Sequence, residues 1–425
     1  MSYYIDEYID VLSPDLKMFG PVEDNSLICV TTPPGCWGPM ITPSIKSGHE
    51  VTKPINVKNA MPGDAIAITI KKIKVISAYT TSGVSKAIEG RYKIDPTINA
   101  ICPTCNITNP ETYTKGYGEQ AIKCKQCNNS IVPQTIEEGY TLIFDQEKKI
   151  GISVTKEKIK KIIEELDNPL PNKSKQHLSS KLLIGDVQNI ISRVKPMIGN
   201  IGTIPSKKVP SSRNSGDVLK TLIKSDEFSN VNKEDLTDGH MDINTVTEDS
   251  IVIVPVKVAG GGVYLGDVHS VQGNGELAGH TADISAHVDI KVNVIKNLNI
   301  DGPIIIPNKD TLSDIYQPIS ENEYQITQEI ANKHNLDLPE KSYPIQFVGS
   351  DENLNKAIDN AILRAEKATG LSANEIKNRA TVSGSVDIGR TSGIIYITVM
   401  LPVSIIKEMN LLKYVLKLFE ESDRM

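Results

Sequence analysis

The sequence lacks a long apolar run, a leader-like N-terminus and an excess of basic residues. No apolar stretch approaches the roughly 18 residues that a membrane-spanning helix needs, and residues 1–20 carry acidic groups without an apolar segment flanked by positive charge. A net charge of -6 is also unlike the basic surface of a general nucleic-acid-binding protein. We therefore expect a cytoplasmic protein whose partners include neither a membrane nor a nucleic acid.

The composition is that of an ordinary globular protein. Of the 425 residues, 39% are hydrophobic and 23% are charged, which argues against the disordered and fibrous classes. A chain of this length is more often divided into two lobes than folded as one compact domain.

Apolar periodicity predicts strands in both halves of the chain. Residues 64–76 alternate small or apolar residues with polar ones and follow a Pro-Gly turn signal. Residues 250–258 are almost continuously β-branched, which is typical of a buried strand. In residues 284–294 every second residue is apolar, so we expect His287 and Asp289 on the opposite face of that strand.

Helical spacing appears in a middle segment and near the C-terminus. Residues 155–166 form an amphipathic pattern, and a second helical stretch is expected before Lys195. Residues 354–365 repeat the pattern, and Ser372 followed by Glu375 predicts the start of a further helix. Because strands dominate and most helices come late, we predict an α+β fold that is predominantly β.

Four cysteines form a metal-binding pattern in the first half. They stand as two C-x-x-C pairs separated by 18 residues, at Cys102, Cys105, Cys124 and Cys127. Two such pairs supply four thiolates in a tetrahedron, which suits a structural Zn²⁺ in a zinc ribbon. A rubredoxin-like iron site, a redox pair and a nucleic-acid-binding ribbon are the alternatives. Cys29 and Cys36 have no partner in the pattern, and Trp37 lies in a turn-rich loop expected to close the edge of a β lobe.

These patterns divide the chain into four parts. Residues 1–100 together with 129–154 are expected to form an N-terminal β-rich lobe, which residues 101–128 interrupt as the inserted zinc ribbon. Residues 155–195 are expected to be a helical connector, and residues 196–425 a C-terminal α+β lobe that carries the active site.

Histidines and carboxylates gather in the later half. Four of the seven histidines are interleaved there with six carboxylates, namely His240, His269, His280 and His287 with Asp238, Asp242, Asp267, Glu276, Asp283 and Asp289. Asp267 and His269 are two apart and would share one face of a strand, and Glu276 ends a glycine-rich loop. Such groups suit a catalytic divalent ion, whereas surface charges on a hairpin are the alternative.

The remaining histidines are given ordinary roles. We expect His280 and His287 to be exposed strand residues rather than site residues. We expect His49, His177 and His334 to be surface or locally bonded side chains.

Several segments resemble the acetamidase/formamidase family. Residues 262–276 (GVYLGDVHSVQGNGE) are similar to its signature, a strand that runs into G-D-x-H and then Q-G-x-G-E. Residues 61–64 resemble an early A-x-P-G-D segment, and residues 197–205 resemble the segment that opens the second half of the family. Residues 238–242 stand where the family has G-G-N-x-D, and residues 345–402 resemble its C-terminal part. The resemblance covers most of the chain outside the cysteine insertion and the connector.

The resemblance implies hydrolysis of a small linear carboxamide to ammonia and a carboxylate, in a β-rich fold that commonly forms homo-oligomers. By motif position it implies a site at Asp242, Asp267, His269 and Glu276. We assign His269 and the two aspartates, with His240 as an added ligand, to a second divalent metal, Zn²⁺ or Ca²⁺, that polarises the amide carbonyl. Glu276 is assigned the transfer of a proton to the departing nitrogen.

Four further residues complete the implied site. Asp283 joins His269 and Glu276 as a catalytic residue, at the position where the family has a longer Glu. Gln272, Gly273 and Gly275 in the glycine-rich loop are assigned to substrate binding.

Departures from the family pattern keep other functions open. His240 replaces the Asn and Asp238 the first Gly of G-G-N-x-D, and Asp283 is one methylene short. A carboxylate displaced by about an ångström can cost roughly a hundredfold in rate. The alternatives are a non-catalytic metal- or ligand-binding scaffold of the same fold and a hydrolase of another small C–N substrate. Four retained residues favour catalysis over a scaffold, because nothing structural demands their combination around a glycine-rich loop: Asp267, His269, Gln272 and Glu276.

Overall fold

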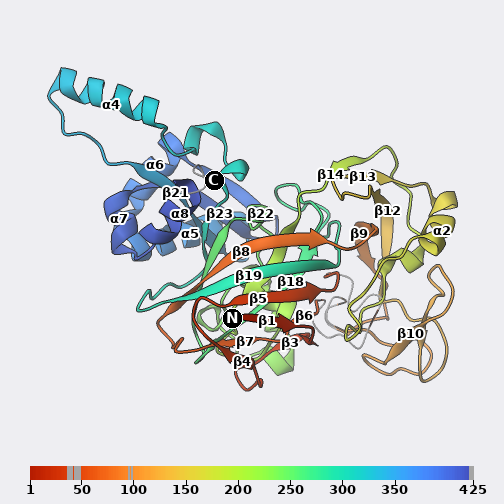
Figure 1. Cartoon of the computed structure of the whole chain (residues 1–425). Coiled ribbons are helices and arrows are strands. Elements are labelled where there is room, and N and C mark those ends of the chain that lie inside the picture. The colour runs from red at the N-terminus through yellow and green to blue at the C-terminus, as the bar shows by residue number, and fades with distance from the viewer. Residues whose placement is uncertain (36–41, 43–48, 94–95, 97–98, 421–425) are drawn as a thin grey trace.

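A computed structural model describes residues 1–35, 42, 49–93, 96 and 99–420 (Figure 1). The interpretations of Cys36 and Trp37 concern positions outside the described residues.

The largest sheet runs through the middle of the molecule. Within the described residues its nine strands lie in the order β1 (Ser2–Ile5), β5 (Leu27–Thr32), β19 (Ala286–Ile295), β8 (Ala65–Val75), β17 (Ile251–Pro255), β20 (Ile304–Ile306), β21 (Ser342–Ser350), β23 (Ile394–Pro402) and β22 (Ser385–Arg390). Strands β8, β17 and β19 confirm the three strands predicted from periodicity. In β19 the even-numbered residues from Ala286 to Val292 are buried and His287 is exposed, as the alternation predicts.

A second sheet packs against the first. Its strands lie in the order β2 (Tyr8–Ile9), β6 (Val51–Thr52), β18 (Gly261–His269), β7 (Ile55–Val57) and β4 (Phe19–Val22), and β15 (Met197–Gly202) also pairs with β18. One apolar core joins the two sheets, with Ile66 and Ile68 of β8 on one side and Val263 and Leu265 of β18 on the other. All nine residues of β18 are buried, so this strand lies inside the molecule. A short pair, β3 (Val11–Leu12) with β16 (Val209–Pro210), lies beside it.

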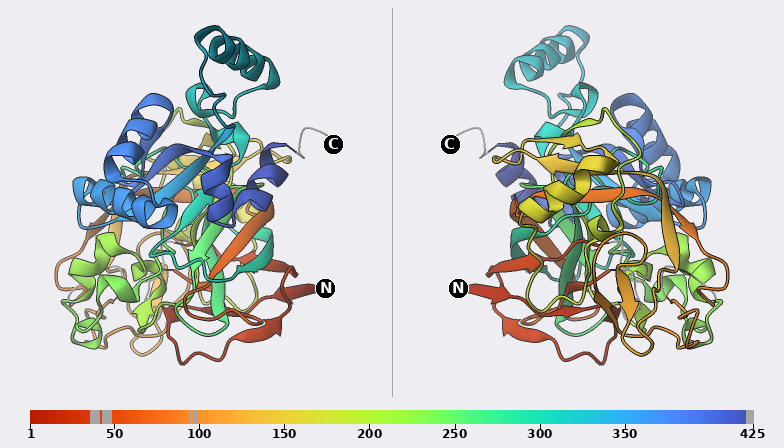
Figure 2. Two further views of the ribbon diagram at one scale, coloured as in Figure 1. Left: turned by 90° about the vertical axis from the view of Figure 1, so that its left-hand side faces the viewer. Right: turned by 90° about the vertical axis from the view of Figure 1, so that its right-hand side faces the viewer.

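Helices from the C-terminal part of the chain cover the end of the large sheet that β21, β23 and β22 form (Figure 2). They are α5 (Leu354–Thr369), α6 (Ala373–Ser383), α7 (Val403–Glu408) and α8 (Leu412–Phe419). Helix α5 buries Ala357, Ala361 and Ala365 on the face that meets β21 and β23. A Cβ at Gly349 of β21 would lie 2.0 Å from the Ala357 carbonyl oxygen, so only glycine permits this close approach. Helix α6 begins after Ser372, whose side chain accepts from the Glu375 N–H, which confirms the predicted start.

A smaller sheet forms the opposite side of the molecule. It contains β14 (Ile191–Arg193), β13 (Ile150–Ser153), β12 (Gln134–Phe144) and β9 (Tyr79–Ala87), with α2 (Lys156–Glu165) beside it and the hairpin of β10 (Thr112–Thr114) and β11 (Ile122–Cys124) below it in Figure 1. Helix α2 confirms the predicted amphipathic helix. The second helical stretch expected before Lys195 is wrong: the chain makes a short 3-10 turn at Ser179–Leu182 and then the edge strand β14. Pairing of β14 with β13 supplies hydrogen bonds that a local pattern does not reveal.

One helix stands away from the rest of the molecule. Helix α4 (Glu321–His334) follows β20 and precedes β21, and in Figures 1 and 2 it projects beyond the other elements. Its start is fixed by a capping box between Ser320 and Glu323. A four-residue helix, α3 (Leu219–Leu222), lies in the loop region after β16. No helix in the described part of the chain is both long and apolar enough to cross a membrane.

Candidate metal and active site

The end of the buried strand β18 brings two predicted residues together. Asp267 and His269 are both fully buried, and the Asp267 Oδ1 atom lies 3.2 Å from His269 Nε2. Asp283 comes from the segment that enters β19, where its backbone bridges to that of His269. Its Oδ1 atom lies 3.6 Å from the same His269 nitrogen. One imidazole nitrogen therefore faces two carboxylates.

His240 and Asp242 reach the same place from a different loop. The loop is held against β15 by a backbone bridge between His240 and Asn200. The Nε2 atom of His240 lies 3.0 Å from Asp242 Oδ2 and 3.5 Å from Asp267 Oδ2. Although burial and the charge of Arg390 oppose protonation, the two carboxylates raise the pKa of His240 to about 9.

His49 is a member of the cluster that the sequence interpretation missed. It was expected to be an ordinary surface or locally bonded histidine, but it is 2% exposed, and its Nδ1 lies 3.6 Å from Asp267 Oδ2. Its ring lies edge to face with that of His240, with 4.5 Å between centroids. Burial lowers the pKa of His49 to about 3. The position follows from β6, which begins two residues later and pairs with β18 beside Asp267, and no local pattern carries that information.

Glycines let the backbone approach the carboxylates. A Cβ at Gly35 would lie 1.7 Å from Asp267 Oδ1, and a Cβ at Gly199 would lie 2.3 Å from Asp242 Oδ1. Three site carboxylates also have left-handed backbone conformations, with φ of 49° at Asp242, 57° at Asp267 and 42° at Glu276. Such conformations cost energy in non-glycine residues and cluster at functional sites.

The glycine-rich loop contributes Gln272 and Glu276. Gln272 Nε2 donates to the carbonyl oxygens of Asp242 and Gly389, which turns its Oε1 toward His269 Nδ1 at 2.9 Å. When the imidazole is neutral, this contact leaves the lone pair on Nε2, toward the carboxylates. Both polar atoms of Gln272 are thus used inside the protein.

Glu276 is a buried carboxylate with an unused oxygen. Its Oε1 atom, like Asp242 Oδ1, makes no hydrogen bond with any residue that the structure describes. Burial first, and then the negative charge of Asp242, raise the pKa of Glu276 well above its usual value. A raised pKa means that this carboxyl group keeps its proton to a higher pH than an exposed glutamate does.

Arg390 borders the cluster and was also missed from the sequence. Its guanidinium binds Asp217 with two hydrogen bonds of 2.9 Å, and its third nitrogen lies 2.6 Å from Asp242 Oδ2. Ser215 donates to Asp217 as well. Because the residue comes from the end of β22, only the folded chain brings it near Asp242.

Among the described residues of the site, three overlapping sets of side chains offer ligand atoms within 4.8 Å of one another. They are His49, His240 and Asp267; Asp242, His269 and Glu276; and Asp267, His269 and Asp283. Mixed imidazole and carboxylate donors suit a divalent cation such as Zn²⁺. The two unsatisfied carboxylate oxygens provide charge that a cation would balance.

The other histidines lie elsewhere or at the border. His287 is exposed on β19, where its Nδ1 lies 2.8 Å from Thr31 Oγ1, and His334 ends the projecting helix. His177 contacts Thr112 Oγ1 beside the cysteine hairpin. His280 is half-buried in the loop before β19, with its Nε2 atom 3.0 Å from Ser85 Oγ, so the expectation of an exposed strand residue is wrong for it. Burial lowers its pKa to about 4.

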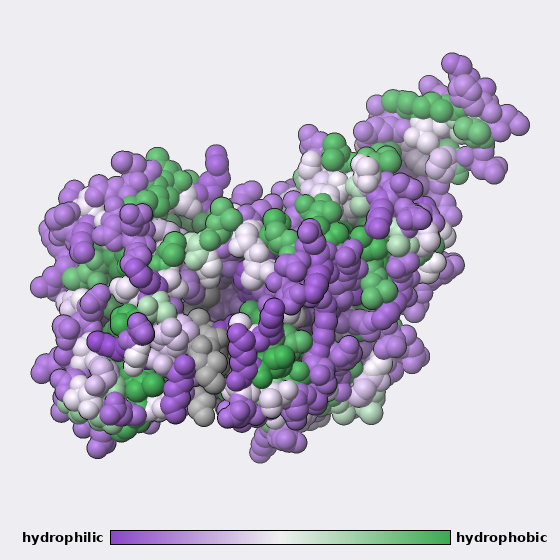
Figure 3. All heavy atoms as spheres, turned by 180° about the vertical axis from the view of Figure 1, so that it is seen from behind, coloured by the Kyte–Doolittle hydropathy of each residue, from purple (hydrophilic) through white to green (hydrophobic). Residues whose placement is uncertain are grey.

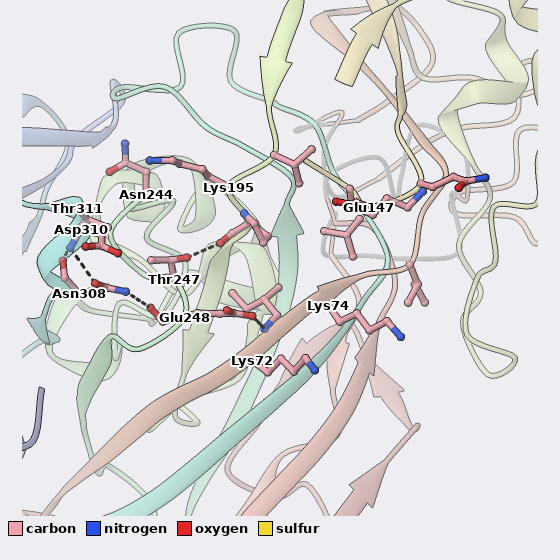
Figure 4. Close-up of a pocket in the computed structure, with 17 residues that line it drawn as sticks. Lys72, Lys74, Glu147, Lys195, Asn244, Thr247, Glu248, Asn308, Asp310 and Thr311 are labelled. Carbon is pink, nitrogen blue, oxygen red and sulfur yellow. Dashed lines mark hydrogen bonds between the residues drawn. The ribbon is translucent and has the colours of Figure 1, made fainter. Parts of the chain in front are cut away.

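A groove of about 770 Å³ lies next to the site without containing it (Figure 4). Lys72, Lys74 and Lys195 lie on its walls, and none of the cluster residues does. The groove and the glycine-rich loop meet at Asn244, whose side chain donates to Asn274 Oδ1 at 2.6 Å. A large cavity is usually the default candidate for an active site. In this protein, however, the clustered histidines and carboxylates lie in the buried cluster and not in the groove.

The four predicted cysteines form a second, separate cluster. Their sulfur atoms all lie within 4.8 Å of one another, and the Cys102–Cys127 and Cys105–Cys124 pairs are 3.5 and 3.8 Å apart. These distances are far above a disulfide bond length and fit four thiols arranged around one ion. Among the described residues, a small apolar cluster that includes Ala100 and Ile131 packs around them.

A comparison with known protein families finds a family whose sequence model matches most of the chain. The sequence model of the Acetamidase/Formamidase family matches residues 37–237 and 232–408. A formamidase of Methylophilus methylotrophus is 37% identical over 78 residues, which is 17% of this chain and 19% of that protein. The stretch shared with this curated relative is thus short.

Solved structures match over almost the full length. A predicted acetamidase/formamidase from Thermoanaerobacter tengcongensis has a TM-score of 0.55 and 18% identity, covering 97% of this chain and 99% of that one. An acetamidase from Bacillus halodurans has a TM-score of 0.53 and 16% identity, with coverages of 96% and 99%. An acetamidase from Yersinia enterocolitica has a TM-score of 0.54 and 15% identity, with coverages of 95% and 93%. At these identities the likeness shows a common fold, which confirms the predicted α+β, predominantly β class.

Proposed function

This chain belongs to the acetamidase/formamidase family, and we propose that it is a metal-dependent hydrolase that converts a small linear carboxamide into a carboxylate and ammonia. One observation carries the proposal: Asp242 Oδ1 and Glu276 Oε1 are buried without a hydrogen-bond partner among the described residues, in a cluster with His269. Buried carboxylate oxygens are costly unless a ligand uses them.

The side chains present fit a divalent cation. We assign its binding to Asp242, Asp267 and His269, with His240 and the newly found His49 as further donors. A bound Zn²⁺ or Ca²⁺ would polarise the amide carbonyl and lower the pKa of a water molecule.

The chain's own groups account for the proton transfers. In the overall reaction water adds to the carbonyl carbon, the C–N bond breaks, and the nitrogen leaves as ammonia. Glu276 Oε1 accepts the proton of the water and delivers it to the departing nitrogen, for which its raised pKa is suited. Gln272 holds the His269 ring in place through Nδ1. Asp283 restrains the same ring from the Nε2 side, and Gly273 and Gly275 present the loop backbone to the substrate.

A non-catalytic scaffold is the second candidate, because a protein cation already lies beside the cluster. Arg390 approaches Asp242 to 2.6 Å and balances part of its charge. If the positive charge of Arg390 alone balances the carboxylates of the cluster, the protein would keep its fold without binding a metal and would not hydrolyse amides. A hydrolase of another small C–N substrate differs from the first proposal in the substrate only.

Metal analysis of the purified protein, combined with an ammonia assay on a panel of small amides, separates these candidates. We expect two ions per chain in the parent, one in Cys102→Ser/Cys105→Ser and one in His269→Ala. We also expect ammonia release to disappear only in the His269 variant. A single ion bound by the cysteines, with no amide hydrolysed, would replace the amidase by the scaffold.

We propose a structural Zn²⁺ at the four cysteines, which makes residues 101–128 an inserted ribbon between the two parts of an N-terminal lobe. Thiols that bind zinc must stay reduced, which fits a cytoplasmic protein. We further propose that the chain forms a homo-oligomer and that its small-molecule partner is the amide.

A further inference from the structure

The projecting helix α4 presents apolar side chains to solvent. Ile326 and Ile330 are 48% and 54% exposed and stand four residues apart, so they form one stripe along the helix. Leu336 and Leu338, in the segment that returns to β21, are also exposed. Figure 3 shows hydrophobic surface along this projecting segment. Ala331 is the one buried residue of α4 among those described.

An isolated helix of this length is expected to be only marginally stable unless its apolar face packs against another surface. Helices shorter than about 12–15 residues are marginal in water by propensity alone, and most helical stability in proteins comes from packing of an apolar face. Helix α4 has 14 residues, and its exposed face carries the larger apolar side chains. The stripe therefore points to a surface that covers it.

The same chain contains a groove whose lining is mainly apolar and could accept the apolar stripe of α4. It lies between α5, α6 and β22, with a volume of about 320 Å³, and Ile358, Ile362 and Ala380 are among its lining residues. Val386 of β22, also in the lining, is half exposed. Lys377 lies at the rim.

Charge favours α4 as the occupant of this groove. Glu329 flanks the Ile326–Ile330 stripe on one side of the helix, and neither Glu329 nor Lys377 forms an ion pair within the described part of the chain. An acidic edge beside an apolar stripe matches a basic rim beside an apolar groove. Helix α4 projects away from the body that carries the groove, so a second copy supplies the helix more simply than the same copy does (Figure 1).

We propose that α4 of one copy binds in the α5–α6–β22 groove of a second copy, and that the exchange is reciprocal. Because each chain carries both the helix and the groove, one two-fold axis satisfies both surfaces. The inference names the contact surface for the homo-oligomer proposed above, and it does not depend on amide hydrolysis.

Sedimentation velocity of the full-length protein over a range of concentrations tests the exchange. We expect a dimer in the parent and a dissociation constant raised at least tenfold in Ile326→Asp/Ile330→Asp. The matched control is Ile191→Asp, at an exposed isoleucine on the edge strand β14, which should remain dimeric. Circular dichroism of the variants checks that the body is folded.

Charge reversal tests the orientation of the helix in the groove. Glu329→Lys and Lys377→Glu should each weaken the dimer, and the two changes in one chain should recover most of the loss. A second readout uses Ile330→Cys in one tagged copy and Ala380→Cys in another, which should form an intermolecular disulfide under mild oxidation.

Three results would overturn the proposal. They are a parent that is monomeric at all concentrations, a dimer that the α4 double variant and Lys377→Glu leave unchanged, and a dimer that Ile191→Asp abolishes. Ammonia release measured on the same samples keeps a failure of this inference separate from a failure of the proposed activity.

Discussion

At the scale of single residues, the site depends on a few side chains whose partners are fixed by the protein. Gln272 orients His269, and Arg390 joins Asp217 to Asp242. Glu276 differs from these, because its Oε1 atom has no hydrogen-bond partner within the described structure. Because Glu276 is buried but its Oε1 atom makes no structural hydrogen bond, its replacement should lower amide hydrolysis strongly and change the stability of the fold little.

Replacing Glu276 by Gln should remove proton transfer and retain shape. We expect kcat to fall by roughly 10²–10⁴-fold, the usual contribution of a general acid–base group. Metal content and thermal stability should stay near those of the parent. The neighbouring Leu277→Ala, at a strongly exposed position, is the control. Full activity of the Gln variant would remove Glu276 from the mechanism.

Replacing Arg390 by Ala should destabilise the fold. The change leaves Asp217 buried with its charge unpaired, and breaking a buried pair from one side costs about 3–5 kcal/mol. Arg379→Ala provides a matched comparison, because its ion pair with Glu375 is on the helix surface and such pairs are worth about 0.3–0.5 kcal/mol. Urea unfolding of both variants measures the difference, and equal losses would contradict the structural role of Arg390.

At the scale of elements, how much the sequence could predict depended on whether the signal was local. Strands β8, β17 and β19 and helix α5 were predicted because their apolar periodicity lies within one segment. The family motif located Asp267 and His269 in the same way. His49 and Arg390 were missed because they meet the cluster through pairing of β6 with β18 and through the end of β22. The helix expected before Lys195 failed because sheet pairing decided that segment.

Close backbone contact at β15 gives an element-scale prediction. In Gly199→Ala the added Cβ would meet Asp242 Oδ1 at 2.3 Å and Asp267 Oδ2 at 2.7 Å, so the carboxylates must move. We expect a loss of at least tenfold in affinity for the active-site metal and a matching fall in ammonia release. Gly90→Ala is the control, because it has open space around its Cβ although its φ of 77° brings some strain. Retained affinity in Gly199→Ala would show that the carboxylates are not held where the geometry requires.

The cysteine hairpin should depend on its ion. Its apolar surroundings are small, so removal of zinc by a chelator, or Cys102→Ser/Cys105→Ser, should expose residues 101–128 to proteolysis while the two large sheets stay intact. Limited proteolysis with mass spectrometry measures this. Equal protection with and without the metal would contradict a structural role for the ion.

At the scale of the whole molecule, the proposed active site and the proposed dimer contact are formed by different elements of the chain. The contacts in the buried histidine–carboxylate cluster come from one chain, and the projecting helix α4 follows β20 at the other end of the large sheet, near α5 and α6. The two properties should therefore be separable.

A monomeric variant should remain active. We expect Ile326→Asp/Ile330→Asp to keep kcat within about twofold of the parent, because both side chains are exposed on the projecting helix whereas the cluster residues are buried. Steady-state ammonia release at concentrations where the variant is monomeric is the measurement. A large fall in kcat that follows dissociation would mean that the second copy contributes to the site.

The position of the cysteine insertion has a consequence for how this chain could acquire or lose it. Ala87, the last residue of β9, lies opposite Gln134, the first residue of β12, in an antiparallel pair. The segment between these two residues, which contains the proposed ribbon of residues 101–128, thus leaves and rejoins the sheet at facing residues, as the tip of a hairpin does. Lengthening a hairpin tip costs closure entropy that grows only with the logarithm of its length. A short turn in place of residues 88–133 would leave the register of β9 and β12 unchanged, so a chain without this segment could keep the same scaffold.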